Sequence, residues 1–520
     1  MRQFFVIFFI LIGYISISVG DQTSPLVFEK RSFIGTELLG RPTHKSVNIN
    51  VIPAQNMELY YEYGTEPGSY TKKTKTITVK SNDSVNTIIA NLLPDTMYYY
   101  RMRYRIANTA EFVKRNEYHF HTQRKQGSSF TFTVQADSHL ETWKHCNPQL
   151  YRQMILNAYE CKSDFHIDLG DTFRSSKLVR KNFNPKKQNR KEGLNFDSVK
   201  QLYFNQRPYF GLLCHSAPLF LVLGNHEMEV GWDMNGTAEC LPVWSTRARK
   251  MYYPNPVADG FYTGDSKEEK FVGLRENYYA WEWGDALFVT LDPWWYTKGE
   301  ESENAEHGPR NLWDFTIGDE QYQWLKKTLE QSKAKYKFVF SHHLIGSCRG
   351  AIEMAAYYEW GGKDRNGVWK FDEMRPNWEM PIHQLMVKNK VTIFFQGHDH
   401  LFARQTLDGI VYQECPMPAN SGYYGQGGYQ SGDILPSAGH ISVKVSKESI
   451  TVDYIRAYLP EQEKDGKKNG MIDYSYTISN KGEMKVNYSS PEVTHETYNN
   501  RRKDKNKHEG RKNKQDNEEY

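Results

Sequence analysis

The chain has 520 residues and 14% aromatic side chains, a composition that argues against a wholly disordered protein. The formal net charge is only +4, and residues 501–520 supply +3 of it through eight Lys or Arg against five Asp or Glu. The remainder is nearly neutral, so the charge balance does not indicate nucleic-acid binding. The length predicts two or three domains with a large buried core.

The first twenty residues are typical of a secretory signal peptide. One positive charge at Arg2 precedes an almost wholly apolar run from Phe4 to Val19, and Gly20 supplies a small residue before Asp21. The alternative is a membrane anchor, because the run nearly reaches the length that spans a bilayer. Cleavage is the preferred interpretation. It predicts a secreted protein, extracellular or periplasmic, with no membrane contact after the signal is removed.

Six cysteines are present, and an exported protein can form disulfides among them. No two have C-x-x-C spacing, so a cysteine zinc site is not predicted. Cys146 and Cys161 bracket an expected helix. That helix would hold them roughly 20 Å apart, which excludes a mutual disulfide.

A small β-sandwich is predicted at residues 45–124, after the signal peptide at 1–20 and an irregular linker at 21–44. Strand-like alternation and turn residues repeat along this part of the chain. The string from Leu92 to Arg101 resembles the strand entry of fibronectin type III domains, in which a tyrosine closes a corner of the sandwich. Core packing is the preferred interpretation of its aromatic residues, and this domain carries no evident chemistry.

From about residue 125 to 490, strands alternate with helices, a pattern that predicts a layered α/β domain. The expected helices lie at 148–160, 197–214, 318–334 and 380–389. Two hairpins are expected, one joined at Gly284-Asp285 and one with Lys447-Glu448 near its turn. Residues 491–520 form a polar, basic tail that we expect to be disordered.

Chemically reactive side chains follow five apolar runs, each typical of a buried strand. The runs FTFTVQA, FHIDL, LFLVL, KFVF and VTIFFQ lead into D-S-H at 137–139, G-D at 170–171, G-N-H-E at 224–227, S-H-H at 341–343 and G-H-D-H at 397–400. Ionisable residues at several strand ends gather at one mouth of a sheet. Distant segments of a chain can build a metal site in this way.

The residue types indicate which metals would bind. Asp, Asn and His offer oxygen and nitrogen ligands without thiolates, a set that suits Zn, Mn or Fe. In an extended segment residues i and i+2 face the same side, so Asp137 and His139 can bind one ion together. His398 and His400 share this spacing. Seven candidate ligands exceed the need of one ion, and two ions about 3.5–4 Å apart fit the count.

These blocks resemble the calcineurin-like metallophosphoesterase superfamily and, within it, the purple acid phosphatases. All five occur in the family's order, over roughly residues 128–460. An N-terminal fibronectin-like domain is also typical of the larger purple phosphatases. The resemblance implies an α/β protein in which the N-terminal β-sandwich is followed, at 125–490, by a four-layer α/β/β/α metallophosphoesterase domain. One block alone would have an ordinary structural explanation, but five in order favour the functional one.

The resemblance also implies the metal ligands. Asp137, His139, Asp171 and His400 would hold the first metal, and Asp171 would bridge to the second, which Asn225, His342 and His398 complete. His342 is preferred over His343 because of its position at the strand end. We expect Asp399, Glu227 and His343 to orient the ligands through hydrogen bonds.

The implied reaction is hydrolysis of a phosphomonoester by hydroxide that the two metals generate. His226 would not bind metal. It would instead face the phosphate and protonate the leaving oxygen. Arg349 and Arg174 are candidates for contacts with the remaining phosphate oxygens.

The chain departs from the purple enzymes after the bridging aspartate. Those enzymes carry a tyrosine three residues later, where this chain has Arg174, and they lack the equivalent of His139. The tyrosinate–iron(III) bond that gives the colour should therefore be absent, and a divalent metal pair is expected. Arg174 also opens a basic segment, 174–191, with eight Lys or Arg and no acid. A solvated loop is its preferred interpretation, and a lip that attracts anionic substrate is the alternative.

Three functions stay open from the sequence. The preferred one is a secreted two-metal phosphomonoesterase. The others are a phosphodiesterase with the same metal pair and a non-catalytic extracellular binding protein, against which the intact ligand set argues. The predicted partner is a phosphate-ester substrate, with no requirement for nucleic acid. The oligomeric state is not predicted.

Overall fold

The computed structural model describes residues 32–107, 109, 111–140, 146–173, 195–298, 311–344, 349–423 and 428–495. From Ser32 onward the chain forms one unit. The expectations for the signal peptide, for the basic segment at 174–191 and for the tail beyond residue 495 lie outside the described residues. Within the described ranges, no helix is long and apolar enough to cross a membrane.

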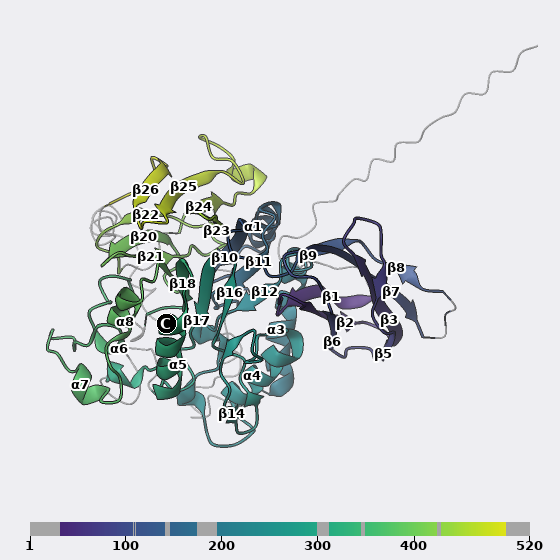
Figure 1. The fold of residues 1–520 in the computed structure, drawn as a ribbon, viewed down its shortest axis with the longest axis horizontal. Helices are drawn as coiled ribbons and strands as arrows, with labels where there is room; N and C mark the ends of the chain where they lie inside the picture. The colour runs from purple at the N-terminus through teal and green to yellow at the C-terminus, as the bar shows by residue number, and fades with distance from the viewer. Residues whose placement is uncertain are drawn as a thin grey trace, which may run out of the picture. The chain divides into compact units, whose positions relative to one another are not determined.

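The strands β1–β9 form the N-terminal β-sandwich, coloured purple to blue in Figure 1. One sheet contains β1 (Phe33–Gly40), β2 (Ser46–Pro53) and β6 (Val85–Ala90). The other contains β3 (Met57–Gly64), β4 (Lys72–Lys73), β5 (Ile77–Val79), β7 (Met97–Ile106), β8 (Val113–Lys114) and β9 (Tyr118–His121). Alternate side chains of β2, β3 and β7 fill the core between the two sheets.

Two details of the sandwich differ from the sequence-based expectation. Residues 33–40, expected to be irregular, form β1 and pair antiparallel with β2. The glycines at 35 and 40 weaken the strand pattern in the sequence, but pairing with β2 overrides it. Tyr98 is buried, as core packing predicts, and its hydroxyl also accepts a hydrogen bond from the Leu93 N–H at 2.9 Å. The tyrosine therefore closes the corner as well.

Two larger sheets face each other in the second domain. The seven-stranded sheet has the order β12 (Leu219–Leu221), β11 (Phe165–Asp168), β10 (Phe130–Gln135), β23 (Gly439–Val445), β24 (Ser449–Arg456), β25 (Ile472–Ser479) and β26 (Met484–Ser489). The eight-stranded sheet has the order β13 (Thr263–Gly264), β16 (Tyr279–Trp283), β17 (Ala286–Thr290), β18 (Tyr336–Phe340), β19 (Ile393–Gln396), β21 (Ile410–Glu414), β20 (Phe402–Leu407) and β22 (Asp433–Leu435). A separate short ribbon pairs β14 (Glu268–Glu269) with β15 (Gly273–Leu274).

The core between these sheets is strongly aromatic. Phe132 of β10 stacks on Phe165 of β11 with ring centroids 5.5 Å apart, and it meets Phe288 of β17 edge-on at 5.1 Å. Phe340 and Phe395 stack at 5.0 Å on the facing sheet. Such interlocked rings resist relative sliding of the two sheets, so the strand ends at the mouth keep fixed positions.

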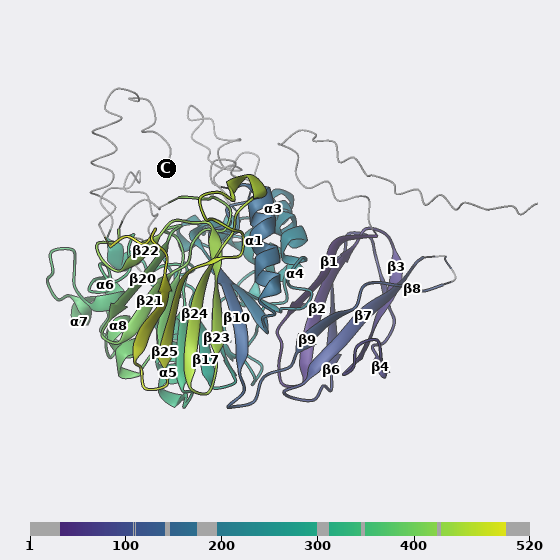
Figure 2. The same ribbon diagram turned by 90° about the horizontal axis from the view of Figure 1, so that it is seen from above.

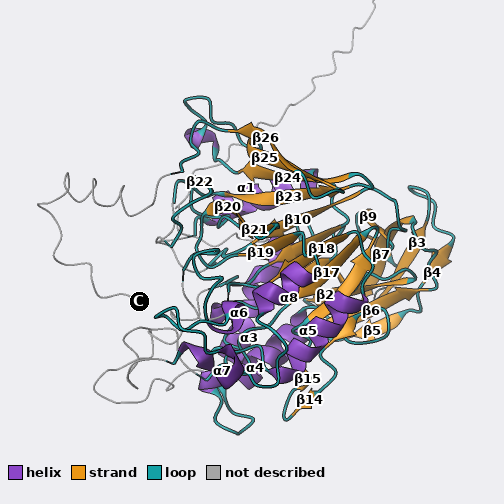
Figure 3. Cartoon of the chain, turned by 60° about the vertical axis from the view of Figure 1, so that its left-hand side comes forward, coloured by secondary structure: helices purple, strands orange, loops and turns teal. Residues whose placement is uncertain are grey.

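Helices cover the outer faces of the sheets. The helix α1 (Pro148–Glu160) contacts β23 and lies beside α3 (Phe196–Phe210), which packs on α4 (Leu241–Tyr252) (Figure 2). The eight-stranded sheet is covered by α5 (Asp319–Gln331), α6 (Tyr358–Gly361), α7 (Phe371–Met374) and α8 (Ile382–Lys388) (Figure 3). Short 3-10 turns are η2 (Asn225–Glu227), η3 (Gly231–Asp233), η4 (Leu312–Asp314) and η5 (Pro460–Gln462). This α/β/β/α layering after a β-sandwich confirms the predicted fold class.

Helix α1 has the predicted bounds, because the Asn147 side chain caps it and Pro148 occupies its first turn. The other three expected helices occur but are shorter, and both expected hairpins, β16–β17 and β23–β24, are confirmed.

Helix α4 was not expected. It lacks two usual start signals, because Cys240 at its N-cap makes no side-chain hydrogen bond and no acidic residue lies in its first turn. Four of the described cysteines are free thiols: Cys161, Cys214, Cys240 and Cys415.

Candidate metal centre

The five reactive motifs end strands of two different sheets. In the seven-stranded sheet β10, β11 and β12 run parallel and side by side, and in the eight-stranded sheet β18 and β19 do the same. Parallel strands present their carboxyl ends at one edge of a sheet. Because the two sheets face each other, both edges meet and the side chains form one cluster. The sequence predicted one sheet mouth, whereas the structure builds the mouth from two.

The loops after β10 and β11 are joined backbone to backbone. The N–H of Asp137 donates to the carbonyl of Gly170 at 2.9 Å, and the N–H of His139 donates to the carbonyl of Asp171 at 3.0 Å. Gly170 has φ +94°, and a Cβ there would collide with the backbone nitrogen of Gly224. Only glycine allows the loops after β11 and β12 to approach this closely.

Several candidate ligands have an unusual backbone conformation. Left-handed φ angles occur at Asp137 (+60°), His139 (+41°), Asp171 (+53°), His398 (+75°) and His400 (+66°). Residues other than glycine seldom adopt this region, and such conformations persist where the surrounding structure imposes them. The motif loops are thus fixed by their neighbours, as a preformed site requires.

Asp171 lies at the centre of the cluster. Its Oδ2 atom is 3.3 Å from His342 Nε2, 3.8 Å from His139 Nε2 and 3.9 Å from His226 Nε2. Its Oδ1 atom accepts the backbone N–H of His226 at 2.8 Å. Asp171 also groups with His342 and His398, whose ligand atoms all lie within 4.8 Å of one another. One carboxylate therefore faces histidines from both sheets.

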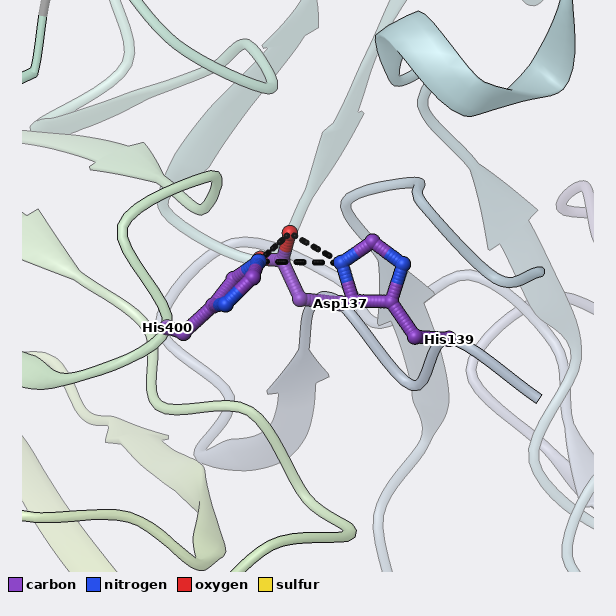
Figure 4. Close-up of side chains that lie close together, drawn as sticks. All are labelled: Asp137, His139 and His400. Carbon is purple, nitrogen blue, oxygen red and sulfur yellow. Dashed lines mark hydrogen bonds and ion pairs between the residues drawn. The ribbon is translucent and has the colours of Figure 1, made fainter. Parts of the chain in front are cut away.

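A second carboxylate, Asp137, lies beside the first. Its Oδ1 atom is 3.3 Å from His400 Nε2, 3.6 Å from His139 Nε2 and 3.9 Å from His342 Nε2. Figure 4 shows the first two rings converging on this carboxylate, with their Nε2 atoms 2.9 Å apart. Its Oδ2 atom accepts the N–H of His398 at 2.8 Å, which leaves Oδ1 for the cluster.

The electrostatics of the cluster favour a cation. Asp137 Oδ1 is buried and accepts no hydrogen bond from any residue that the structure describes. His342 Nδ1 is 2.9 Å from the carbonyl of Leu169, so in the neutral ring Nε2 carries the lone pair that faces Asp171. Burial lowers the pKa of His342, but the charges of Asp171 and Asp137 outweigh burial and raise it to about 10. Burial opposes ionisation of Asp171, yet His342 and His226 hold its pKa well below its ordinary value. Oxygen and nitrogen atoms this close around buried negative charge fit divalent metal ions.

His398 is kept in the form that binds metals. Burial and the charge of Arg349 hold its pKa well below the ordinary value, so the imidazole stays neutral. Arg349 is partly exposed, and its Nη1 donates to the His398 carbonyl at 2.6 Å and to Asp399 Oδ1 at 3.0 Å. It lies beside the site, and its contact with substrate stays a prediction. Arg174 lies outside the described residues.

The preference for His342 over His343 agrees with the geometry. His342 belongs to a cluster of candidate ligands, whereas His343 belongs to none within the described residues. The ring of His343 packs edge-on against Trp294 and lies 4.7 Å from the ring of His398. Asn225 opens η2 directly after the β12 loop and is partly buried.

Glu227 holds two motif loops together. Its carboxylate accepts the N–H groups of Gly224 (2.6 Å), Asp171 (2.8 Å) and Thr172 (2.9 Å), and also the hydroxyl of Thr172 (2.9 Å). Burial and the nearby charge of Asp171 raise the pKa of Glu227 to about 7. The expected orienting role of Glu227 agrees with these contacts. Asp399 instead binds Arg349 and the N–H of Gly350 (2.9 Å).

Sequence patterns do not single out a further set of supporting residues. These residues hold the motif loops through hydrogen bonds and are Ser138, Thr172, Tyr203 and Gln206. Ser138 and Thr172 lie inside or next to a motif. Tyr203 and Gln206 lie on α3, and nothing in their spacing connects them to the site.

A two-sheet fold with a carboxylate–histidine cluster at the mouth defines a metallophosphoesterase. The calcineurin-like phosphoesterase family matches residues 130–402, more than half of the chain, so the chain belongs to that family. It is a phosphoric ester hydrolase of a class that uses divalent metal ions. No curated protein sequence matches the chain significantly.

Solved structures share the fold. The structure of PhoD is 14% identical, covers 90% of this chain and 94% of that one, and has a TM-score of 0.61. The purple acid phosphatase PPD1 from seeds of yellow lupin (Lupinus luteus) is 14% identical, covers 85% of this chain and 74% of that one, and has a TM-score of 0.54. At such low identity the likeness extends to the fold alone.

Proposed function

We propose that this chain is a secreted phosphomonoesterase that uses two divalent metal ions, either Zn, Mn or Fe. The observation that supports it most is the position of Asp171, whose carboxylate faces His139 on one side and His342 with His398 on the other. Within the described residues, no single group of candidate ligands contains histidines from both sides. Two ions about 3.5–4 Å apart that share this carboxylate can reach both sides.

The ligand sets follow the two halves of the cluster. One ion would be held by Asp137, His139, Asp171 and His400, and the other by Asp171, Asn225, His342 and His398. When bound, the ions would activate the attacking water and neutralise charge on the phosphoryl group.

His226 would act on the leaving group. Its backbone N–H is anchored on Asp171 Oδ1, and its ring is 22% exposed, whereas the carboxylate of Asp171 is buried. The ring therefore borders the side from which substrate arrives and would hold the proton that passes to the leaving oxygen. By distance His226 also groups with His139 and Asp171. The metal content of a His226 variant therefore decides whether this residue is a ligand. Arg349 and Arg174 would contact the remaining phosphate oxygens.

The test combines metal analysis with two substrates. Purified protein supplied with Zn, Mn or Fe should hold about two metals per chain. It should hydrolyse p-nitrophenyl phosphate faster than bis(p-nitrophenyl) phosphate. The reverse preference would indicate a phosphodiesterase. Metal-loaded protein that hydrolyses neither ester would contradict the proposal and favour a binding protein.

Two further measurements test the visible spectrum of the iron-loaded protein and its export. Because Arg174 replaces the tyrosine of the purple enzymes, the iron-loaded protein should lack the visible tyrosinate charge-transfer band. Protein collected outside the producing cell should begin at Asp21. Protein that stays with the cells and keeps an intact N-terminus at Met1 would support the membrane anchor instead.

A further inference from the structure

We propose that helix α3 positions the loops that carry the bridging aspartate and the proton donor, and that the N-terminal β-sandwich anchors this helix. The inference rests on the proposed two-metal function. It assigns positioning roles to Gln206, Tyr203 and Arg207, which touch neither the candidate metals nor substrate. It also implies that the β-sandwich supports the reaction of the second domain by anchoring α3.

The first contact is at Thr172, the residue after Asp171. Its carbonyl accepts three hydrogen bonds, from the N–H of Leu140 (3.1 Å), from Ser138 Oγ (2.9 Å) and from Gln206 Nε2. The first two donors flank His139 in the neighbouring motif. Gln206 lies on α3 and is 1% exposed. A side chain of α3 thus meets the loops after β10 and β11 at their shared junction.

The second contact is at Glu227. Tyr203 lies three residues before Gln206, so both side chains leave the same face of α3. Its hydroxyl donates to the Glu227 carbonyl at 3.0 Å, and its own carbonyl accepts the Tyr253 hydroxyl at 2.7 Å. The Glu227 carboxylate in turn binds the backbone of Asp171. One helix face therefore contacts the loops after β11 and β12, and the loop after β10 is bonded to the first of them at Thr172.

The third contact ties α3 to the sandwich. Arg207 is 1% exposed, and its Nη2 donates to the carbonyl of Thr36 in β1 (2.9 Å) and of Asn50 in β2 (3.2 Å). Its Nε and Nη1 make no hydrogen bond with any described residue. A buried guanidinium is costly to desolvate. The two hydrogen bonds from Arg207 to β1 and β2 offset part of this desolvation cost and hold α3 next to the sandwich at the residue after Gln206.

Ordinary core packing is the alternative, and it predicts a different result. If α3 only fills space, weakening its polar contacts should lower stability without changing metal affinity. If α3 positions the loops, metal affinity should change even in a variant that keeps its fold. Contiguity alone does not demonstrate coupling, so the distinction needs measured affinities.

The variant Gln206→Met distinguishes core packing by α3 from positioning of the loops by α3. Methionine has a similar length, the Gln206 Oε1 atom has no hydrogen bond to a described residue, and the Thr172 carbonyl keeps two other donors. The replacement therefore leaves no buried polar group unpaired, and the variant should fold. The matched control is Gln201→Met, on the exposed side of the same helix, where Gln201 bonds only to Asn205 among the described residues.

Metal titration calorimetry of the wild type and both variants gives the readout, with thermal unfolding as the check on folding. We expect Gln206→Met to weaken the lower-affinity metal by roughly tenfold to a hundredfold, the range typical of residues that support metal ligands. It should lower kcat more than it changes KM. Gln201→Met should match the wild type. Should Gln206→Met fail to fold, Tyr203→Phe removes one hydroxyl and tests the same helix face.

The anchor is tested by a second pair of variants. Arg207→Met removes the contact between the sandwich and α3. Arg41→Met removes a partly exposed ion pair with Asp259 at 3.2 Å that also joins the two domains but does not involve α3. We expect only Arg207→Met to weaken metal binding.

The outcomes separate this inference from the function on which it rests. A wild type that binds no metal would remove the proposed function itself. A wild type with two metals, together with unchanged affinities in Gln206→Met and Tyr203→Phe, would overturn only the role of α3. Equal loss in Arg207→Met and Arg41→Met would overturn the anchoring by the sandwich.

Discussion

Among the buried histidines that the structure describes in the second domain, two groups have contrasting environments. His166 on β11 is 2.8 Å from Thr133 Oγ1 through its Nδ1, and His440 on β23 is 3.5 Å from the thiol of Cys161. Burial lowers the pKa of both imidazoles to about 3. His342 is equally buried, yet its pKa is raised to about 10.

The difference comes from the carboxylates. Asp171 and Asp137 face His342, whereas a hydroxyl and a thiol contact the other pair. In a low-dielectric interior a histidine without a counter-charge stays neutral, whereas His342 beside two carboxylates takes up a proton, and the same carboxylates attract a metal cation. Histidine alone does not create a metal site in this fold.

The largest effect should follow Asp171→Asn, which keeps the shape of the side chain and removes its charge. Without the negative charge of the shared carboxylate, the repulsion between the two candidate cations is less well offset. We expect phosphatase activity to disappear and metal content to fall from about two to about one or fewer per chain. Elemental analysis of the purified variant measures this. Full metal content would show that Asp171 does not bridge.

His226→Asn should separate proton transfer from metal binding. We expect kcat to fall by about 10²–10⁴-fold, the range of general acid–base catalysis, with about two metals retained. A substrate with a better leaving group should recover part of the rate, because it needs less protonation. If the substitution instead strips a metal, His226 is a ligand and the assigned role is wrong.

Metal affinity should rise with pH. In the metal-free protein His342 has a raised pKa of about 10, so it holds a proton below that pH, and a metal must displace this proton. Each proton released makes the apparent affinity about tenfold stronger per pH unit up to the folded pKa. Calorimetric titrations between about pH 6 and pH 9 measure the slope. An affinity that does not vary with pH over this range would contradict protonation of His342.

The smallest effect should come from the other histidine pair. We expect His440→Gln to leave metal content and kcat unchanged, because neither His440 nor His166 faces a carboxylate of the site. The lost packing and hydrogen bonding should lower the free energy of unfolding by about 1–3 kcal/mol, measured by denaturant titration. Loss of metal in this variant would contradict the claim that only the histidines beside Asp171 and Asp137 bind metal.

Local signals allowed much of the fold to be predicted. Asn147 and Pro148 mark the start of α1, and the apolar runs before each motif do form buried strands. Tertiary contacts decided the rest. The glycine-interrupted β1 exists because β2 pairs with it, and α4 is stabilised by burial, including the ion pair of Arg249 with Glu229.

The site shows the same division. Motif spacing predicted the residues that cluster around Asp171, because ligands must follow strand ends. It could not predict that two sheets share the mouth, since sheet assignment depends on long-range pairing. Nor could it find Gln206 and Tyr203, because a side chain that acts on a loop backbone leaves no pattern of residue types. Nor could it predict that the Nη1 of Arg349 binds Asp399 beside the site.

Elemental analysis of purified wild-type protein, after exposure to Zn, Mn or Fe and removal of free metal, decides whether the carboxylate–histidine cluster holds a metal pair. We expect about two metal ions per chain, fewer in Asp171→Asn and the same number in His440→Gln. A wild-type chain that retains no metal under these conditions would contradict this expectation.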